Sequence, residues 1–247
     1  MKRMVPPLVL LGPALAWLVV FLVFPLMLIF AFSFFQRGSF GQIVYDPTFK
    51  NYLRLFNPTV LRVFLHSLRL AALVTMLALL LGYPTAYFIA NQPARWKNTL
   101  LVLVILPFWT SYLIRTYAWI VLLNREGVLS RLLISLGLSR EPISFLYNDT
   151  AILIGLLYGY LPFMVLPLYS AIERLNPEIR EASFDLGATP FQTFFRITLP
   201  LTLRGVVTGA IFVFVPSLGN FFVPELLGGG QRFMIGNMIN NQFLKAR

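Results

Sequence analysis

Cysteine is absent from this chain of 247 residues, and histidine occurs only once, as His66. The chain therefore has no thiol nucleophile, no disulfide framework and no cluster of the side chains that most often hold zinc. Charged residues make up 12% of the chain, whereas a soluble domain has roughly 25%. These absences exclude an ordinary soluble enzyme, and we expect no catalytic residue, no metal site and no cofactor.

Apolar residues take the place of the missing charges: they make up 58% of the chain, and the mean hydropathy is +0.77. Five apolar stretches approach or exceed the roughly 20 residues that a helix needs to cross a bilayer, and Arg115 is the only charge inside them. They are apolar on all sides, unlike the alternating strands of a membrane barrel. The sequence therefore predicts an all-α, polytopic membrane protein with one transmembrane domain over residues 1–247. The expected spans are 8–35, 70–90, 99–123, 151–172 and 206–223.

Basic residues give the chain a net charge of +11, but they are spread over both sides of the expected spans, with no run of five or more. This distribution does not favour a nucleic-acid partner. The density of Lys and Arg is slightly higher on the side of the N-terminus, which predicts a cytoplasmic N-terminus. For Arg115 we expect pairing with a helix C-terminus or an acid of a partner subunit, or an outward, snorkelling side chain.

The polar loop 173–205 follows the fourth expected span, and its local chemistry predicts two short helices. Asn176 is a good helix N-cap and Pro177 suits the first helical position. Gly187 can adopt the left-handed conformation that ends a helix, so the first helix is expected to run to about Leu186. An amphipathic connector is the alternative interpretation, but the apolar surface of this helix favours a docking element for a cytoplasmic partner.

The second helix of the loop is expected to start at Thr189, which forms a capping box with Gln192. Pro200 is expected to end it, because a proline biases the preceding residue, Leu199, away from helical geometry.

A fixed-spacing motif occupies this loop: Glu181-Ala182-Ser183, three residues, Gly187, nine residues, then Ile197-Thr198-Leu199-Pro200. It resembles the EAA-x3-G-x9-I-x-LP motif of ABC importer permeases, with Ser183 in place of the third motif residue, alanine. The resemblance implies a Type I importer in the bacterial inner membrane, with two permease subunits (a heterodimer), two ATPase subunits and an external solute-binding protein. It assigns ATPase coupling to Glu181, Ala182, Ser183, Phe184, Asp185, Leu186, Gly187 and Ala188, and the motif end to Ile197, Leu199 and Pro200.

The rest of the chain also resembles this family, and most of all its permeases for the polyamines spermidine and putrescine, in stretches such as 51–55, 106–110 and 161–165. Such permeases usually have six spans, so we expect a sixth span to be missing from the C-terminal end. The chain contains no G-x-x-x-x-G-K-[ST] loop, so the energy for transport is expected from a separate ATPase.

A polyamine carries ammonium groups, which carboxylates and aromatic faces bind. Candidates for the substrate pathway are Trp109, Tyr112, Tyr117, Tyr160, Asn220 and Glu225, with Trp119 and Tyr158 as further aromatic residues. Interfacial aromatic residues that contact only lipid are the alternative for each aromatic candidate. A permease for another small amine, such as an opine or aminobutyrate, is the alternative function. A membrane-embedded enzyme is disfavoured, because the spans contain no acid and no histidine.

Overall fold

The computed structural model describes residues 7–37, 43–230 and 232–244 of the chain. The chain divides into two compact units, Met1–Arg62 with Leu244–Arg247, and Val63–Phe243. Each unit is described by itself.

The first unit begins with a long apolar helix, whose 22 residues Leu11–Phe32 have the length and hydropathy of a membrane span. A π-helical turn interrupts it just before Pro25, which lacks the N–H that a regular helix would use there. Two short antiparallel strands and a short helix follow, and the Asn51 amide ties them back by donating to the carbonyls of Ser33 and Phe35, both at 2.9 Å. The elements are α1 (Pro7–Leu18), η1 (Val19–Val23), α2 (Phe24–Phe32), β1 (Phe35–Arg37), β2 (Ile43–Pro47) and α3 (Lys50–Leu55).

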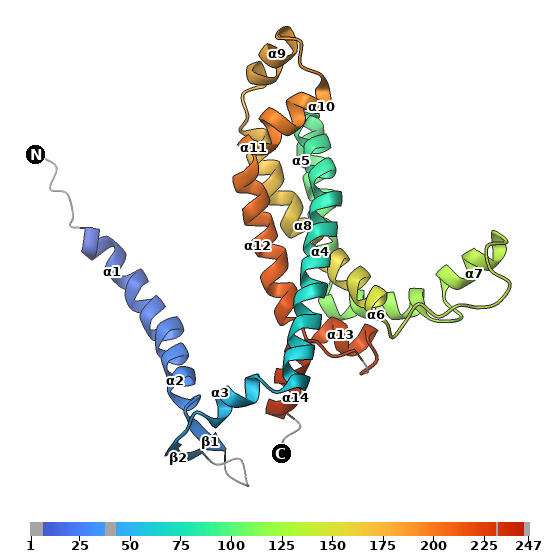
Figure 1. Ribbon diagram of the computed structural model, residues 1–247. Helices are drawn as coiled ribbons and strands as arrows, with labels where there is room; N and C mark the ends of the chain where they lie inside the picture. Colours follow the sequence, from blue (N-terminus) through green and yellow to red (C-terminus); the bar gives the residue numbers. More distant parts are fainter. Residues whose placement is uncertain (1–6, 38–42, 231, 245–247) are drawn as a thin grey trace, which may run out of the picture. The chain divides into compact units, whose positions relative to one another are not determined.

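The described residues of the second unit form helices joined by loops, without a strand, and the unit contains most of α4 and α14 (Figure 1). Its elements are α4 (Pro58–Ala90), α5 (Ala94–Ile105), η2 (Leu106–Trp109), α6 (Tyr112–Leu123), α7 (Val128–Ser135), α8 (Asp149–Glu173), α9 (Pro177–Asp185), α10 (Pro190–Thr193), η3 (Phe194–Thr198), α11 (Leu199–Leu201), α12 (Leu203–Gly219), α13 (Phe222–Leu227) and α14 (Ile235–Leu244).

Helices α8 and α12 lie side by side and form the centre of the bundle (Figure 1). Gly205 and Gly209 are one turn apart on α12 and both face α8. A Cβ atom at Gly205 would lie 2.5 Å from the Cβ of Ala171, and one at Gly209 would lie 2.7 Å from the Sδ of Met164. This small-xxx-small spacing lets the two backbones approach closely, which membrane helices use in place of a hydrophobic driving force.

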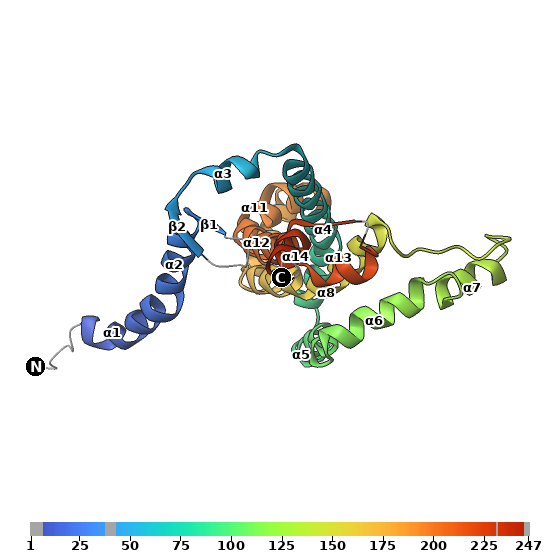
Figure 2. The same ribbon diagram turned by 90° about the horizontal axis from the view of Figure 1, so that it is seen from below.

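Polar contacts fasten the end of the bundle opposite α9, where α13 and α14 lie (Figures 1 and 2). The His66 Nε2 atom on α4 lies 3.2 Å from a carboxylate oxygen of Asp149, the first residue of α8. One residue further along α4, the Ser67 hydroxyl accepts a hydrogen bond of 2.7 Å from the backbone N–H of Ile235 on α14. Because these bonds join α4, α8 and α14, they fix this end of the unit.

Among the described residues, three helices are long and apolar enough to span a membrane, or up to five if each of two bent helix pairs counts as one span. One bend, of 88°, falls inside the predicted span 99–123, between Trp109 and Tyr112. Thr110 and Ser111 both have extended ψ angles, which interrupt the helical hydrogen bonds. The predicted continuous third span is therefore two helices at a sharp angle. The predicted span 206–223 is also divided, because α12 ends at Gly219 and α13 begins at Phe222.

Candidate functional site

The N-terminus of α9 is formed by the cap that the sequence predicts. The Asn176 side chain accepts a hydrogen bond of 3.1 Å from the backbone N–H of Glu178, and its amide donates to the Glu178 carboxylate at 2.9 Å. Pro177 occupies the first turn, where no N–H donor is needed. These contacts confirm the predicted start of the helix.

The C-terminus of α9 also follows the prediction. Gly187 has a φ angle of +81°, in the left-handed region that glycine adopts without steric cost. Its N–H bonds to the carbonyl of Phe184 at 2.9 Å, and the N–H of Ala188 bonds to that of Ser183 at 3.0 Å. This pair of bonds is the Schellman motif, which ends a helix and turns the chain sharply.

The capping box of α10 is confirmed as well, with both of its bonds present between Thr189 and Gln192, at 3.0 and 3.3 Å. The predicted end at Pro200 is wrong, because Leu199 is helical and α11 continues to Leu201. The π-helical turn η3 precedes the proline, and the N–H of Leu199 bonds to the carbonyl of Phe194, five residues back. This wider turn relieves the crowding that a proline ring causes in an α-helix.

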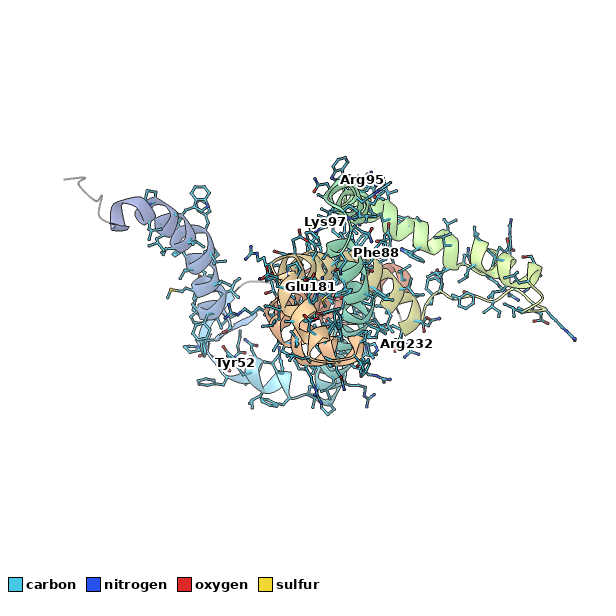
Figure 3. The ribbon with its side chains drawn as sticks, turned by 90° about the horizontal axis from the view of Figure 1, so that it is seen from above. Tyr52, Phe88, Arg95, Lys97, Glu181 and Arg232 are labelled. Carbon is cyan, nitrogen blue, oxygen red and sulfur yellow. The ribbon has the colours of Figure 1, made fainter. Side chains whose placement is uncertain are left out.

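The coupling residues fall into an outward and an inward set. Leu186 is 88% exposed and Phe184 48% exposed, and Glu181, Ala182, Asp185 and Gly187 are exposed with them. Figure 3 labels Glu181 in the view from above. Ser183 is only 5% exposed, and its hydroxyl bonds to that of Thr193 at 2.8 Å, so it holds α9 against α10 instead of facing a partner. Ala188, Ile197 and Leu199 are half-buried, and Pro200 is exposed.

Three contacts that the motif does not predict join α9 and the end of α11 to α4 and the residue that follows it. Arg180 Nη1 donates to the Tyr87 hydroxyl at 3.0 Å and to Asn91 Oδ1 at 2.9 Å, and the Tyr83 hydroxyl bonds to that of Thr202 at 2.8 Å. Tyr83 and Tyr87 lie in the last turns of α4 and Asn91 directly follows it, and their spacing of four residues was the available signal in the sequence.

Three of the six candidates for the substrate pathway come together where α12 ends. The Asn220 side-chain amide donates to the hydroxyls of Tyr112 on α6 and Tyr160 on α8, at 2.9 and 2.8 Å. Its oxygen accepts from the N–H of Val223, so the same side chain caps α13. The Tyr160 hydroxyl in turn donates to the carbonyl of Pro216 at 3.3 Å. We call Tyr112, Tyr160 and Asn220 the Asn220 cluster.

The other three candidates lie outside this cluster. Trp109 is 79% exposed at the bend between η2 and α6, Tyr117 is 55% exposed on α6, and Glu225 is exposed on α13. The additional aromatic pair, Trp119 and Tyr158, packs together with ring centroids 5.6 Å apart.

Arg115 lies next to the Asn220 cluster and stacks on aromatic rings. Its guanidinium carbon is 4.8 Å from the ring centroid of Phe108, 5.6 Å from that of Tyr112 and 6.0 Å from that of Tyr158. Among the described residues, its Nε and Nη1 atoms are buried without a hydrogen-bond acceptor. The expected pairing with a helix C-terminus is therefore not seen, and cation–π contacts hold the charge instead.

The second unit consists of apolar helices that are bent where α5–η2 meets α6 and where α11 meets α12. A short, capped helix with an apolar surface, α9, lies at one end. These features describe a polytopic membrane protein with the Type I ABC importer permease fold. In agreement, the crystal structure of a bacterial ABC transporter involved in the import of the acidic polysaccharide alginate has a chain of the same fold. The TM-score is 0.75 at 21% identity, covering 96% of this chain and 83% of that one.

The family described as the binding-protein-dependent transport system inner membrane component matches residues 78–245, and this chain belongs to it. The chain is 43% identical over 232 residues to the spermidine/putrescine transport system permease protein PotB of Haemophilus influenzae, covering 94% of this chain and 81% of that protein. For PotB of Escherichia coli the identity is 44% over 233 residues, with coverage of 94% and 84%. The predicted resemblance is thus confirmed, and the chain is a multi-pass inner-membrane transport subunit.

Proposed function

We propose that this chain is one of two permease subunits of an ABC importer that carries polyamines, with spermidine and putrescine as its substrates. The observation that carries the proposal is the identity of 43–44% over 94% of the chain to two permeases that are named for these solutes. An identity at this level extends well beyond the motif loop and includes the helices that would line the pathway.

The proposed complex contains a second, homologous permease, two ATPase subunits and an external solute-binding protein. The family's description as binding-protein-dependent supports the last of these. The ATPases would supply the energy, since the sequence has no phosphate-binding loop. They would dock on α9 through the exposed side chains of Phe184 and Leu186, with Glu181 pairing with a basic group. This docking would put α9 on the cytoplasmic side, and the density of Lys and Arg supports a cytoplasmic N-terminus as well.

The Asn220 cluster is the proposed contact for the passing solute. It offers two phenol oxygens, an amide and the aromatic face of Tyr160, and these groups suit ammonium groups, whereas Arg115 already lies over the Tyr112 ring. A contact site without a carboxylate of its own would bind a polycation weakly, and weak binding allows release into the cell.

The test is uptake by the complete transporter in proteoliposomes with ATP supplied to the ATPase side. We expect accumulation of radiolabelled spermidine and putrescine that depends on both ATP and the binding protein. An excess of unlabelled aminobutyrate or of an opine should not reduce the uptake. Uptake of either competitor in place of polyamines would overturn the assigned substrate, and ATP-independent flux would overturn the importer mechanism.

A further inference from the structure

The coupling segment, which consists of α9, α10, η3 and α11, is joined to the bundle in two different ways. Its two ends continue directly into α8 and α12, since α9 follows α8 after three residues and α11 ends one residue before α12. Helix α4 has no such connection to the segment along the chain, and only side chains link the two. Any movement of α9 therefore reaches α8 and α12 through the backbone, whereas the segment contacts α4 directly only through side chains.

Arg180 makes the first of these contacts, at the start of the segment. Its Nη1 atom donates to Tyr87 and Asn91, and its guanidinium carbon lies 5.8 Å from the Tyr87 ring centroid. The Asn91 amide is itself oriented by a bond of 2.7 Å from its Nδ2 to the carbonyl of Tyr87, which leaves Oδ1 for Arg180. The guanidinium is thus held by two oxygens and one aromatic face, from the last turn of α4 and the residue that follows it.

Tyr83 makes the second contact, at the end of the segment. Its ring is 6% exposed and packs edge-on against Phe194 of η3, with centroids 5.2 Å apart. Its hydroxyl bonds to that of Thr202, which is completely buried at the bend between α11 and α12. Since Ser183 also bonds to Thr193, α9 and α10 are fastened to each other.

We propose that Tyr83, Tyr87 and Asn91 form the path by which motion of the coupling segment reaches α4, and that Arg180 is the positioning residue of this path. The inference rests on the proposed function, since it requires an ATPase to move α9. A partner moves a helix only through interactions that differ between two states. Without this link, α4 follows α8 and α12 only through its packing on them, as where Gly82 meets Met164, and its movement is incomplete.

The consequence for transport follows from where α4 lies. An apolar cleft of ≈ 470 Å³ separates α4 from α12, with Thr75 and Met76 on one side and Val207 and Ile211 on the other. A movement of α4 relative to α12 changes the width of this cleft. When the link is broken, ATP hydrolysis no longer produces the complete rearrangement of the spans.

The test is the ratio of solute imported to ATP hydrolysed by the complete transporter in proteoliposomes. We expect Arg180→Met to lower this ratio at least fivefold, because methionine fills a similar space without donating a hydrogen bond. Arg180→Lys, which keeps the charge and one donor, should recover at least half of the ratio. A ratio for Arg180→Met within twofold of the wild type would overturn the proposal.

Lys97→Met is the matched control. Lys97 pairs with Glu173 at 2.8 and 2.9 Å, at the same end of the bundle, but this pair joins α5 to α8 and does not touch α9. The control should keep the wild-type ratio. A fall equal to that of Arg180→Met would overturn the proposal, because any lost cation at this end would then have the same effect.

The Arg180 variants change α9 itself and could therefore weaken the binding of the ATPase. A second variant breaks the same contact without changing α9. Tyr87→Phe combined with Asn91→Leu removes both acceptors at the C-terminal end of α4 and leaves the residues of α9 intact. We expect the same fivefold loss of the ratio, with no further loss when Arg180→Met is added, as for residues that act through one contact. An unchanged ratio in the α4 variant would overturn the inference. If the wild-type complex imports no polyamine, the proposed function fails instead, so the two failures are distinguishable.

Discussion

The coupling segment α9–α11 and the Asn220 cluster are both polar regions of an apolar bundle, but they are built in opposite ways. The segment is a contiguous stretch, with caps, a glycine turn and exposed apolar side chains at its surface. The cluster takes one residue each from α6, the middle of α8 and the end of α12, and its side chains are half-buried. One region presents side chains outward, and the other holds its polar groups between helices.

This difference has a physical consequence for function. A surface formed by one short segment can move as a body, because its internal bonds do not depend on the rest of the bundle. A cluster shared by three helices changes whenever any one of them shifts, because Asn220 must keep contacts with two tyrosines and the start of α13. The first arrangement suits a segment that is moved by the ATPase. The second suits a site whose geometry changes between two states of the transporter.

The largest expected effect comes from the turn that ends α9. Gly187→Leu should abolish uptake and the stimulation of ATP hydrolysis by the binding protein. No atom lies within 4 Å of the position that a Cβ would occupy, so the effect arises from the φ angle of +81° alone. A left-handed conformation costs an L-residue roughly 1–2 kcal/mol, and relieving it would unwind the end of the coupling helix. Stimulated ATP hydrolysis by the reconstituted complex is the measurement.

Gly187→Asn is the matched variant, because asparagine tolerates the left-handed region better than other residues with side chains. It should retain most of the activity. Equal loss in both variants would mean that the side chain, and not the backbone angle, disturbs the contact with the ATPase, and the contrast between the two regions would then need revision.

The coupling segment could be predicted from the sequence because its structure depends on neighbours along the chain. Asn176, Gly187 and the Thr189–Gln192 pair each act within four residues. The single error there, at Pro200, came from a rule that ignores the ability of a π-helical turn to absorb a proline.

The Asn220 cluster could not be assembled from the sequence in the same way. Its residues are 48 and 60 positions apart along the chain, and only the packing of α6, α8 and α12 brings them together. Trp109 and Tyr117 have the same aromatic character but lie on exposed surfaces, and composition does not separate these two cases. The break of the third predicted span, at Thr110 and Ser111, was also missed, because hydropathy does not register backbone angles.

The next largest effect is expected at the exposed tip of the coupling segment. Leu186→Glu should weaken the binding of the ATPase roughly 10- to 150-fold, since burying a leucine stabilises a contact by about 1.5–3 kcal/mol. The thermal stability of the permease itself should not change, because Leu186 is 88% exposed. Titration of the ATPase against the permease in nanodiscs measures the affinity.

Leu138→Glu serves as the control, since Leu138 is 72% exposed in the loop after α7 and lies far along the chain from the coupling motif. It should leave the affinity for the ATPase unchanged. If both variants weaken binding to the same extent, a general change in charge or solubility explains the effect, and the docking surface on α9 is refuted.

A smaller effect is expected in the Asn220 cluster, and it should appear in a different measurement. Asn220→Ala removes two hydrogen bonds to tyrosines and the cap of α13, each worth about 1 kcal/mol. We expect the apparent KM for polyamine uptake to rise roughly fivefold, as one lost contact of this size predicts. Binding of the ATPase should stay normal, in contrast to the Leu186 variant.

Asn220→Asp separates the two roles of this side chain, because aspartate still accepts from the N–H of Val223 but donates to neither tyrosine. It should keep the stability of the bundle while altering the KM. A loss of ATPase binding in either variant would show that the cluster and the coupling segment are not functionally separate.

The smallest expected effect concerns Glu225, which lies on α13 five residues beyond Asn220. A carboxylate near the cluster would attract a polycation by an interaction of roughly 1 kcal/mol or less, because exposure to solvent screens it. Glu225→Gln should therefore reduce polyamine uptake about two- to fivefold at low salt and less at high salt, with assembly intact. Equal uptake by the variant and the wild type at low salt would remove Glu225 from the pathway and confine the solute contact to the uncharged residues of the cluster.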